Sequence, residues 1–181
     1  LQLLALAAIL AALAGPVLAL KRGPGRRYVL LIDRSASMNA SDVEPSRLEE
    51  AKRQAKVFAD SMRSGSALSL RGRSDVAMVI AFDSRAKVMC NFTADKRQVM
   101  AAIEAIEPAD GLSRLTEAVT VARAFAEAPG ADGGTAEGRA QLVLFSDGRI
   151  EDLDAVAVTA DELVFHRIGE SGDNVAVTAM K

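Results

Sequence analysis

The chain has 181 residues, half of them hydrophobic and 4% aromatic, which predicts one domain with a core of Ala, Val, Leu and Ile. The formal net charge is −2, but once the four basic residues before Tyr28 are set aside, 18 basic and 24 acidic residues leave about −6 on positions 28–181. Such an acidic domain is repelled by the phosphates of a nucleic acid, so composition and charge argue against nucleic-acid binding.

Residues 1–20 contain no charged side chain and are dominated by Leu and Ala. About 20 apolar residues cross a bilayer as a helix, and the basic residues that follow in 21–27 are typical of its cytoplasmic flank. We therefore expect a transmembrane anchor at 1–20, a basic linker at 21–27 and a domain on the cytoplasmic side. The alternatives are a secretory signal cleaved after Ala19, although no basic segment precedes the apolar run, and a buried core helix, although no polar face is present.

The globular part begins with a strand, a helix and a hairpin. The apolar run Tyr28–Asp33 predicts a strand buried on both faces, as in a parallel sheet covered by helices. Residues 46–62 predict a helix, since apolar residues recur on one face behind a capping box. Val76–Phe82 and Ala86–Phe92 are apolar strands separated by too few residues for a parallel crossover. We expect an antiparallel hairpin whose second strand lies at the edge of the sheet.

The rest of the chain continues the alternation of helices and strands. We expect helices at Asp95–Ile106 and Leu112–Ala128, a strand at Leu142–Phe145, a short helix at Glu151–Val158 and a strand at Glu162–Ile168. The second of these helices is expected to turn Phe125 inward. The alternation predicts an α/β fold with a mostly parallel sheet over residues 28–170. Residues 171–181 are expected to start a following segment, with a strand at Asn174–Met180.

Polar side chains follow two of the predicted strands, at the edge of the sheet where α/β proteins bind ligands. Residues 33–37 have the pattern D-x-S-x-S, residues 146–148 are Ser-Asp-Gly, and residues 111–116 form a third polar segment at the start of a helix. The alternate spacing of the first pattern can aim three side chains at one point. Carboxylate and hydroxyl oxygens are ligands of Mg²⁺ or Mn²⁺, which predicts a metal site. The competing interpretation is that these residues only form turns and helix caps.

The pattern at 33–37 resembles the D-x-S-x-S signature of von Willebrand factor type A domains, their metal-ion-dependent adhesion site. The turn at 146–148 is similar to the later Asp turn of that family. Residues 113–119 fall on the family segment T-x-L-x-x-A-[LIV], except that Ser113 stands in the place of Thr. The resemblance covers about 28–170. It implies a three-layer, Rossmann-like fold with helices on both faces of a mostly parallel sheet that has one antiparallel edge strand.

The same resemblance implies how a metal would be held, with Mg²⁺ or Mn²⁺ as the cofactor. Three residues would bind it directly and two largely through water: Ser35, Ser37 and Ser113, then Asp33 and Asp147. An open coordination position would accept an acidic side chain from a partner protein. Because Ser113 departs from the family pattern, Thr116, about one turn further along the predicted helix, is the reserve ligand.

An apolar segment followed by such a domain is similar to the bacterial Bat-type, or aerotolerance-type, proteins. Those proteins are membrane-anchored and are associated with MoxR-like AAA+ ATPases. The resemblance implies a place at the bacterial inner membrane and a role in binding a protein partner. The alternative is a subunit of a metal-chelatase complex, which uses the same fold beside an AAA+ motor but needs no membrane anchor.

An enzymatic role is not expected. A haloacid-dehalogenase-like phosphotransferase carries D-x-D after its first strand, and here Ser35 stands in the place of the second Asp. The single histidine, His166, has no nucleophile assigned to it, so no Ser-His-Asp set can be formed. Cys90 is the single cysteine, which excludes an internal disulfide and, with one histidine, a zinc cluster.

Overall fold

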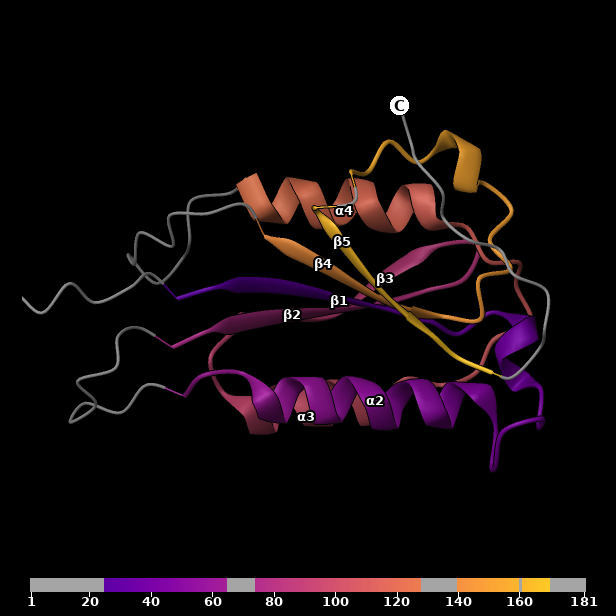
Figure 1. The fold of residues 1–181 in the computed structure, drawn as a ribbon, viewed down its shortest axis with the longest axis horizontal. Helices are drawn as coiled ribbons and strands as arrows, with labels where there is room; N and C mark the ends of the chain where they lie inside the picture. The colour runs from indigo at the N-terminus through magenta and orange to yellow at the C-terminus, as the bar shows by residue number, and fades with distance from the viewer. Residues whose placement is uncertain (1–24, 65–73, 128–139, 160, 170–181) are drawn as a thin grey trace, which may run out of the picture.

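The computed structural model describes residues 25–64, 74–127, 140–159 and 161–169 (Figure 1). Five strands form one sheet in the order β3-β2-β1-β4-β5. Their bounds are Arg27–Asp33 for β1, Val76–Phe82 for β2, Ala86–Thr93 for β3, Gln141–Ser146 for β4 and Leu163–Arg167 for β5. β1 pairs in parallel with β2 and β4, β4 pairs in parallel with β5, and β3 runs antiparallel to β2. The predicted parallel sheet with an antiparallel edge strand is confirmed.

Helices cover both faces of this sheet, which confirms the three-layer fold. α2 (Arg47–Ser61) and α3 (Lys96–Glu104) lie on one face, and α4 (Leu115–Glu127) lies on the other (Figure 1). In the central strand, Ile32 belongs to the core under α2 and α3, whereas Leu31 belongs to the core under α4. Successive side chains of a strand point to opposite faces, so a strand between two helical layers has to be apolar throughout.

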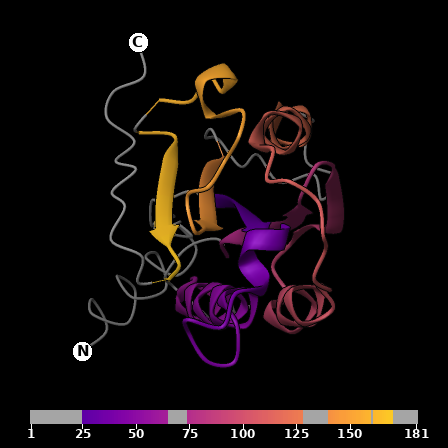
Figure 2. The same cartoon turned by 90° about the vertical axis from the view of Figure 1, so that its right-hand side faces the viewer.

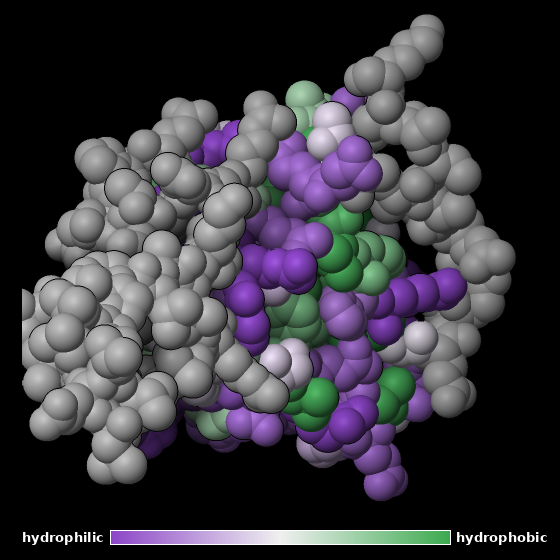
Figure 3. All heavy atoms as spheres, turned by 60° about the vertical axis from the view of Figure 1, so that its left-hand side comes forward, coloured by the Kyte–Doolittle hydropathy of each residue, from purple (hydrophilic) through white to green (hydrophobic). Residues whose placement is uncertain are grey.

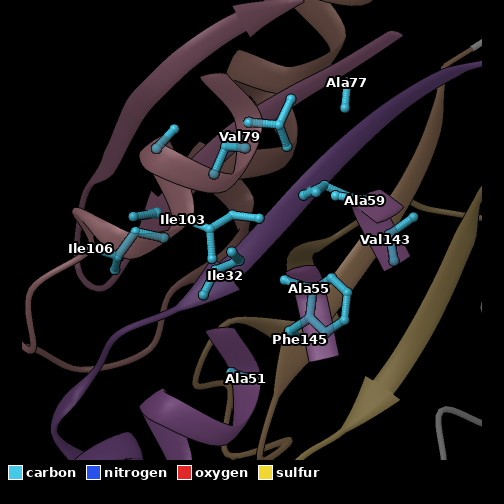
Figure 4. Packing of buried hydrophobic residues seen from close by; sticks show 14 of the residues in the cluster. Ile32, Ala51, Ala55, Ala59, Ala77, Val79, Ile103, Ile106, Val143 and Phe145 are labelled. Atoms are coloured by element: carbon cyan, nitrogen blue, oxygen red, sulfur yellow. The ribbon is translucent and has the colours of Figure 1, made fainter. Parts of the chain in front are cut away.

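Figure 4 shows the core on the side of α2 and α3. Ala55 of α2 and Ile103 of α3 lie around Ile32 of β1, and Phe145 of β4 lies close to Ala55. All four side chains are fully buried. Close packing of this kind makes the core sensitive to any loss of volume.

Hydrophobic side chains are few on the surface of the described part of the chain. The large ones that are exposed are Val57, Leu112, Phe125 and Val164. On the face that Figure 3 draws, hydrophobic residues in green are scattered between hydrophilic ones in purple. The predicted inward position of Phe125 is wrong, since it is 38% exposed. Ala118 and Ala122, which were predicted to lie on the same inward face of α4, are fully buried.

Helix α4 begins at Leu115, three residues later than predicted. The carboxylate of Asp152, from the loop after β4, accepts hydrogen bonds from the backbone amides of Leu115 at 2.7 Å and Thr116 at 3.0 Å. Asp152 therefore caps amides that the first helical turn leaves without partners. Because this cap comes from a distant part of the chain, the local sequence did not indicate that Ser113 stays in the preceding loop.

The short helix predicted at Glu151–Val158 is limited to the 3-10 helix η2 (Leu153–Ala155). Val156 and Val158 are both buried, and the residue between them is exposed. Buried side chains at every second residue suit an extended segment rather than a helix.

We expect Asp152→Ala to lower the free energy of unfolding by about 1–2 kcal/mol, because α4 loses its cap. Burial alone raises the pKa of Asp152, but hydrogen bonds from Thr116 and the amide of Leu115 together hold it below its ordinary value. A carboxylate whose pKa is lowered by folding stabilises the fold at pH values above its pKa in the unfolded state. This contribution is therefore lost as the pH falls below about 4. Urea unfolding at pH 7 and pH 3 measures both effects, with the exposed Asp154→Ala as control. Equal unfolding midpoints for all three proteins at pH 7 would contradict the cap.

Within the described residues, no helix is both long and apolar enough to cross a membrane. The predicted anchor at 1–20, the first part of the linker at 21–27 and the segment at 171–181 with its expected strand lie outside the described residues. The strands and helices given above fall within the predicted domain at 28–170, except that β1 starts one residue earlier.

Candidate metal-binding site

The carboxyl ends of β1 and β4 lie side by side at one end of the sheet, the end that faces the viewer in Figure 2. Ile32 of β1 is in register with Phe145 of β4, so the next residues, Asp33 and Ser146, are also neighbours. After Asp33 the chain soon enters the 3-10 helix η1 (Ala36–Asn39), which lies at this same end (Figure 2). The two predicted polar turns therefore meet at the ligand-binding edge of an α/β sheet.

The carboxylate of Asp33 is fully buried at this edge and is surrounded by hydrogen-bond donors. Its Oδ1 accepts from the backbone amide of Ser35 at 2.9 Å. Its Oδ2 accepts from the hydroxyls of Ser113 at 2.8 Å and Ser146 at 2.6 Å. Burial raises the pKa of Asp33, although the hydrogen bonds from Ser146, Ser35 and Ser113 oppose this effect. A negative charge buried among neutral donors is stabilised by a cation, so Asp33 is suited to anchor a metal ion.

The hydroxyl oxygens beside Asp33 fit a hard cation. Oγ of Ser35 lies 3.3 Å from Oγ of Ser37. Two oxygens bound at right angles to one Mg²⁺, each at about 2.1 Å, lie about 3 Å apart, which is close to this spacing. Ser113 reaches Asp33 from a different segment and is itself buried. The structure thus brings together four of the predicted residues as an all-oxygen set, the kind that Mg²⁺ and Mn²⁺ prefer.

Backbone hydrogen bonds fix the loop that carries Ser113 on two sides. The amide of Ala36 donates to the carbonyl of Gly111 at 2.9 Å, and the amide of Glu151 donates to the carbonyl of Ser113 at 3.0 Å. A Cβ at Gly111 would lie only 3.2 Å from Cβ of Asp83, so glycine permits this close approach. The hydroxyl of Ser113 is therefore held in place by contacts that do not involve a ligand.

Thr116, the reserve ligand, lies apart from this cluster. It is exposed, its amide donates to Asp152, and its hydroxyl also hydrogen-bonds Asp152. Since α4 begins only at Leu115, Thr116 falls within the first helical turn and Ser113 falls in the loop. The structure places Ser113, and not Thr116, beside Asp33.

Asp147, the second predicted carboxylate, is paired with an arginine. Its Oδ2 accepts from Nη1 of Arg47 at 2.7 Å, and its Oδ1 accepts from the amide of Arg149 at 3.0 Å. Gly148 has a φ of +86°, a left-handed conformation that glycine adopts without strain. No hydrogen bond among the described residues joins Asp147 to Asp33 or to the three hydroxyls. A role of Asp147 at a metal stays a prediction.

Two residues at this site are absent from the predicted ligand set. Ser146 donates to Asp33 and accepts from the amide of Gly148 at 3.1 Å. Its position directly before Asp147 at the end of a strand was the available signal. Arg47 is the first residue of α2, and nothing in the local sequence distinguishes it from an ordinary solvent-facing charge at a helix start.

An open pocket lies against the hydroxyls. Among the described residues, no group of three or more His, Cys, Asp or Glu side chains could hold a metal. The candidate metal ligands are instead mainly hydroxyl groups. The pocket has a volume of about 450 Å³, and its walls include both hydroxyl and apolar residues: Ser35, Ser37, Ser113, Leu112, Ile150 and Leu153. A side chain from another molecule can therefore reach the hydroxyls.

Comparison with known proteins decides the family. The sequence profile of the von Willebrand factor type A domain matches residues 28–149. The chain belongs to this family. The chain is also 35% identical, over 152 residues, to a UPF0353 protein of Mycobacterium ulcerans, a match that covers 82% of the chain and 43% of the relative. The chain thus spans less than half the length of the curated relatives that it matches.

Two solved structures extend this comparison. An aerotolerance-related membrane protein from Bacteroides fragilis is 27% identical, with a TM-score of 0.55 over 70% of this chain and 56% of that one. The predicted similarity to aerotolerance-type proteins is confirmed. Proximal thread matrix protein 1 of the mussel byssus, described with a zinc-occupied metal-ion-dependent adhesion site, is 15% identical, with a TM-score of 0.57 over 80% of this chain and 37% of that one. At that identity the similarity shows the fold alone.

Proposed function

We propose that this A domain binds an acidic segment of a partner protein through a divalent cation, Mg²⁺ or Mn²⁺, as an adhesion or scaffold module. The observation that carries the proposal is the carboxylate of Asp33, which is fully buried at the end of β1. It accepts hydrogen bonds from the hydroxyls of Ser113 and Ser146, which belong to two other segments of the chain. Three hydroxyl residues would bind the cation directly and two carboxylates would hold it through water: Ser35, Ser37 and Ser113, then Asp33 and Asp147.

The chemistry of this ligand set supports an outside carboxylate as the missing ligand. Neutral hydroxyls leave most of the charge of a bound cation uncompensated, and the open coordination position takes an anionic oxygen. The adjacent pocket and the exposed Leu112 leave room for the rest of the partner segment. The mussel matrix protein holds zinc in its adhesion site on the same fold, which supports a divalent cation without indicating which one.

We also propose a membrane location for the whole protein. The Bacteroides fragilis neighbour is described as a membrane protein, and residues 1–20 of this chain are apolar. In this proposal residues 1–20 anchor the domain at the cytoplasmic side of the bacterial inner membrane, and a MoxR-like AAA+ ATPase is the candidate partner. Cell fractionation is expected to find the chain in the membrane fraction and a variant without residues 1–20 in the soluble fraction.

Two other functions have less support. A metal-chelatase subunit would use the same fold beside an AAA+ motor, and recovery of the intact chain in the soluble fraction would favour it. A metal-dependent hydrolase of the haloacid-dehalogenase kind would need Asp33 as an accessible nucleophile, yet its carboxylate is fully buried and engaged by three donors. We therefore propose no enzymatic activity. Phosphatase turnover that disappears in Asp33→Asn would reverse this conclusion.

Selection of peptides from a random display library tests the proposed binding mode. The immobilised chain is incubated with the library once in Mg²⁺ and once in a chelator. We expect the peptides retained in Mg²⁺ to be enriched in Asp or Glu and to be released by the chelator. Equal retention in the chelator, or selected peptides without acidic residues, would contradict the proposal.

A matched pair of substitutions tests the third ligand. Ser113→Ala is expected to lower the affinity for Mg²⁺ about tenfold or more, because it removes a hydroxyl that lies beside Asp33. Thr116→Ala is expected to leave the affinity unchanged, because Thr116 lies apart from the cluster. Calorimetric titration of Mg²⁺ and Mn²⁺ into both variants gives the comparison. The reverse order of effects would make Thr116 the ligand.

A further inference from the structure

Arg47 is a buried arginine at the first position of α2, and its guanidinium joins three segments of the site. Nε and Nη2 donate to the two carboxylate oxygens of Asp42, at 2.7 Å and 2.9 Å. Nη1 donates to Oδ2 of Asp147 at 2.7 Å and to the carbonyl of Ser37 at 3.4 Å. Arg47 thus contacts both a proposed ligand residue and the second proposed carboxylate.

The carboxylates around the site differ in their partners. Asp42 and Asp147 pair with Arg47, and Asp83 pairs with Arg34 at 2.8 Å. Asp33, in contrast, accepts its hydrogen bonds from neutral hydroxyl and amide groups. Among the described residues, an arginine therefore pairs with Asp147 and none pairs with Asp33.

We propose that Arg47 is the internal counter-ion of Asp147, and that it weakens the hold of the domain on its cation so that a partner's carboxylate is needed to complete the site. This inference rests on the proposed metal-binding function and concerns its control. Arg47 acts here through Asp147 and does not itself bind the cation.

The positive charge of Arg47 opposes the binding of a cation beside Asp147. The guanidinium of Arg47 is charged, as in any arginine, and it lies between the carboxylates of Asp42 and Asp147. A positive charge within several Å of a divalent cation opposes its binding, and burial reduces the screening by water. A Cβ on Gly169 would lie 2.9 Å from Nε of Arg47, so the turn after β5 closes over this ion pair. With Asp147 paired to Arg47, the carboxylate of Asp33, which accepts from neutral donors in the described part of the chain, supplies negative charge that attracts the metal.

The test is a set of Mn²⁺ titrations of the whole chain, followed by electron paramagnetic resonance of free Mn²⁺. The variants are Arg47→Gln, Arg47→Lys, Asp147→Asn and the double variant Arg47→Gln with Asp147→Asn. No partner is added, so the metal alone is the probe. Thermal unfolding without metal is recorded for each protein to separate folding from binding.

We expect Arg47→Gln to bind Mn²⁺ about five- to tenfold more tightly than the wild type, because a nearby positive charge is removed. Arg47→Lys keeps the charge and stays near the wild-type affinity. Asp147→Asn leaves the guanidinium partly uncompensated and weakens binding. The double variant removes both charges of the pair, so it is expected to bind Mn²⁺ more tightly than Asp147→Asn alone and less tightly than Arg47→Gln alone.

A merely structural Arg47 gives the opposite result, since Arg47→Gln would then lose affinity together with stability. That outcome overturns the inference. If Arg47→Gln leaves too little folded protein because two carboxylates lose their partner, the comparison of the double variant with Asp147→Asn decides: tighter Mn²⁺ binding by the double variant supports the inference, and equal or weaker binding overturns it. A wild-type chain that binds no Mn²⁺ contradicts the proposed metal site itself, which is a separate failure.

Discussion

Asp33→Ala is expected to reduce the affinity for Mg²⁺ and Mn²⁺ about 100-fold while the domain stays folded. The carboxylate orients the hydroxyl of Ser113 and the amide of Ser35, and it supplies the negative charge buried at the ends of β1 and β4. Loss of a group that holds metal ligands in place lowers metal affinity by about 10–100-fold, and loss of the charge adds to this effect.

The same substitution should be well tolerated in the absence of metal. Burial raises the pKa of Asp33, so ionisation of its carboxyl lowers the stability of the fold, and the substitution removes this cost. Calorimetric titration measures the affinity and urea unfolding measures the stability, with the exposed Asp110→Ala, at the same end of the molecule, as control. Intact Mn²⁺ binding by a folded Asp33→Ala protein would place the metal site elsewhere.

Phe145→Ala is expected to lower the free energy of unfolding by about 3–5 kcal/mol, the range observed when a buried aromatic ring is removed from a core. Phe145 is fully buried in β4 and stacks on His166 of β5, with ring centroids 4.8 Å apart. The cavity would open under α2, where Ala55 lies close to the ring (Figure 4). Ala55 is too short to fill the space.

Phe125→Ala provides a control with the same change of side chain. Phe125 is 38% exposed on α4, so its loss is expected to change the free energy of unfolding by less than about 1 kcal/mol. Urea unfolding of both variants at pH 7 makes the comparison. Similar losses in the two variants would mean that the sheet between the helical layers is packed differently from Figure 4.

The strands could be predicted because their pattern is local. An uninterrupted apolar run such as Tyr28–Asp33 has one plausible place in a soluble domain, the middle of a sheet covered on both faces. The hairpin followed from the short connection between β2 and β3 alone. The start of α4 could not be predicted, since its cap, Asp152, is supplied by a loop that lies far along the chain.

The residues of the candidate site also fall into those that the local sequence predicts and those that depend on the complete fold. Asp33, Ser35 and Ser37 lie within five residues, so their spacing alone predicts that they gather. The place of Ser113 came from a family resemblance, and the structure supplies the contact with Asp33. The pairing of Arg47 with Asp147, 100 positions away, depends on the complete fold, and no sequence pattern around either residue predicts it.

The order of the strands in the sheet determines when the candidate metal site can form during folding. β1 is the first strand of the chain, but one of its two neighbours is β4, and the hydrogen bond from Ser146 to Asp33 joins residues 113 positions apart. Contacts between segments so distant in sequence form slowly during folding, because a long loop has to close first. A nascent chain that ends before β4 exposes one edge of its central strand and lacks Ser146, which donates to Asp33, and Asp147. The capacity to retain Mn²⁺ should therefore arise among the last events of refolding.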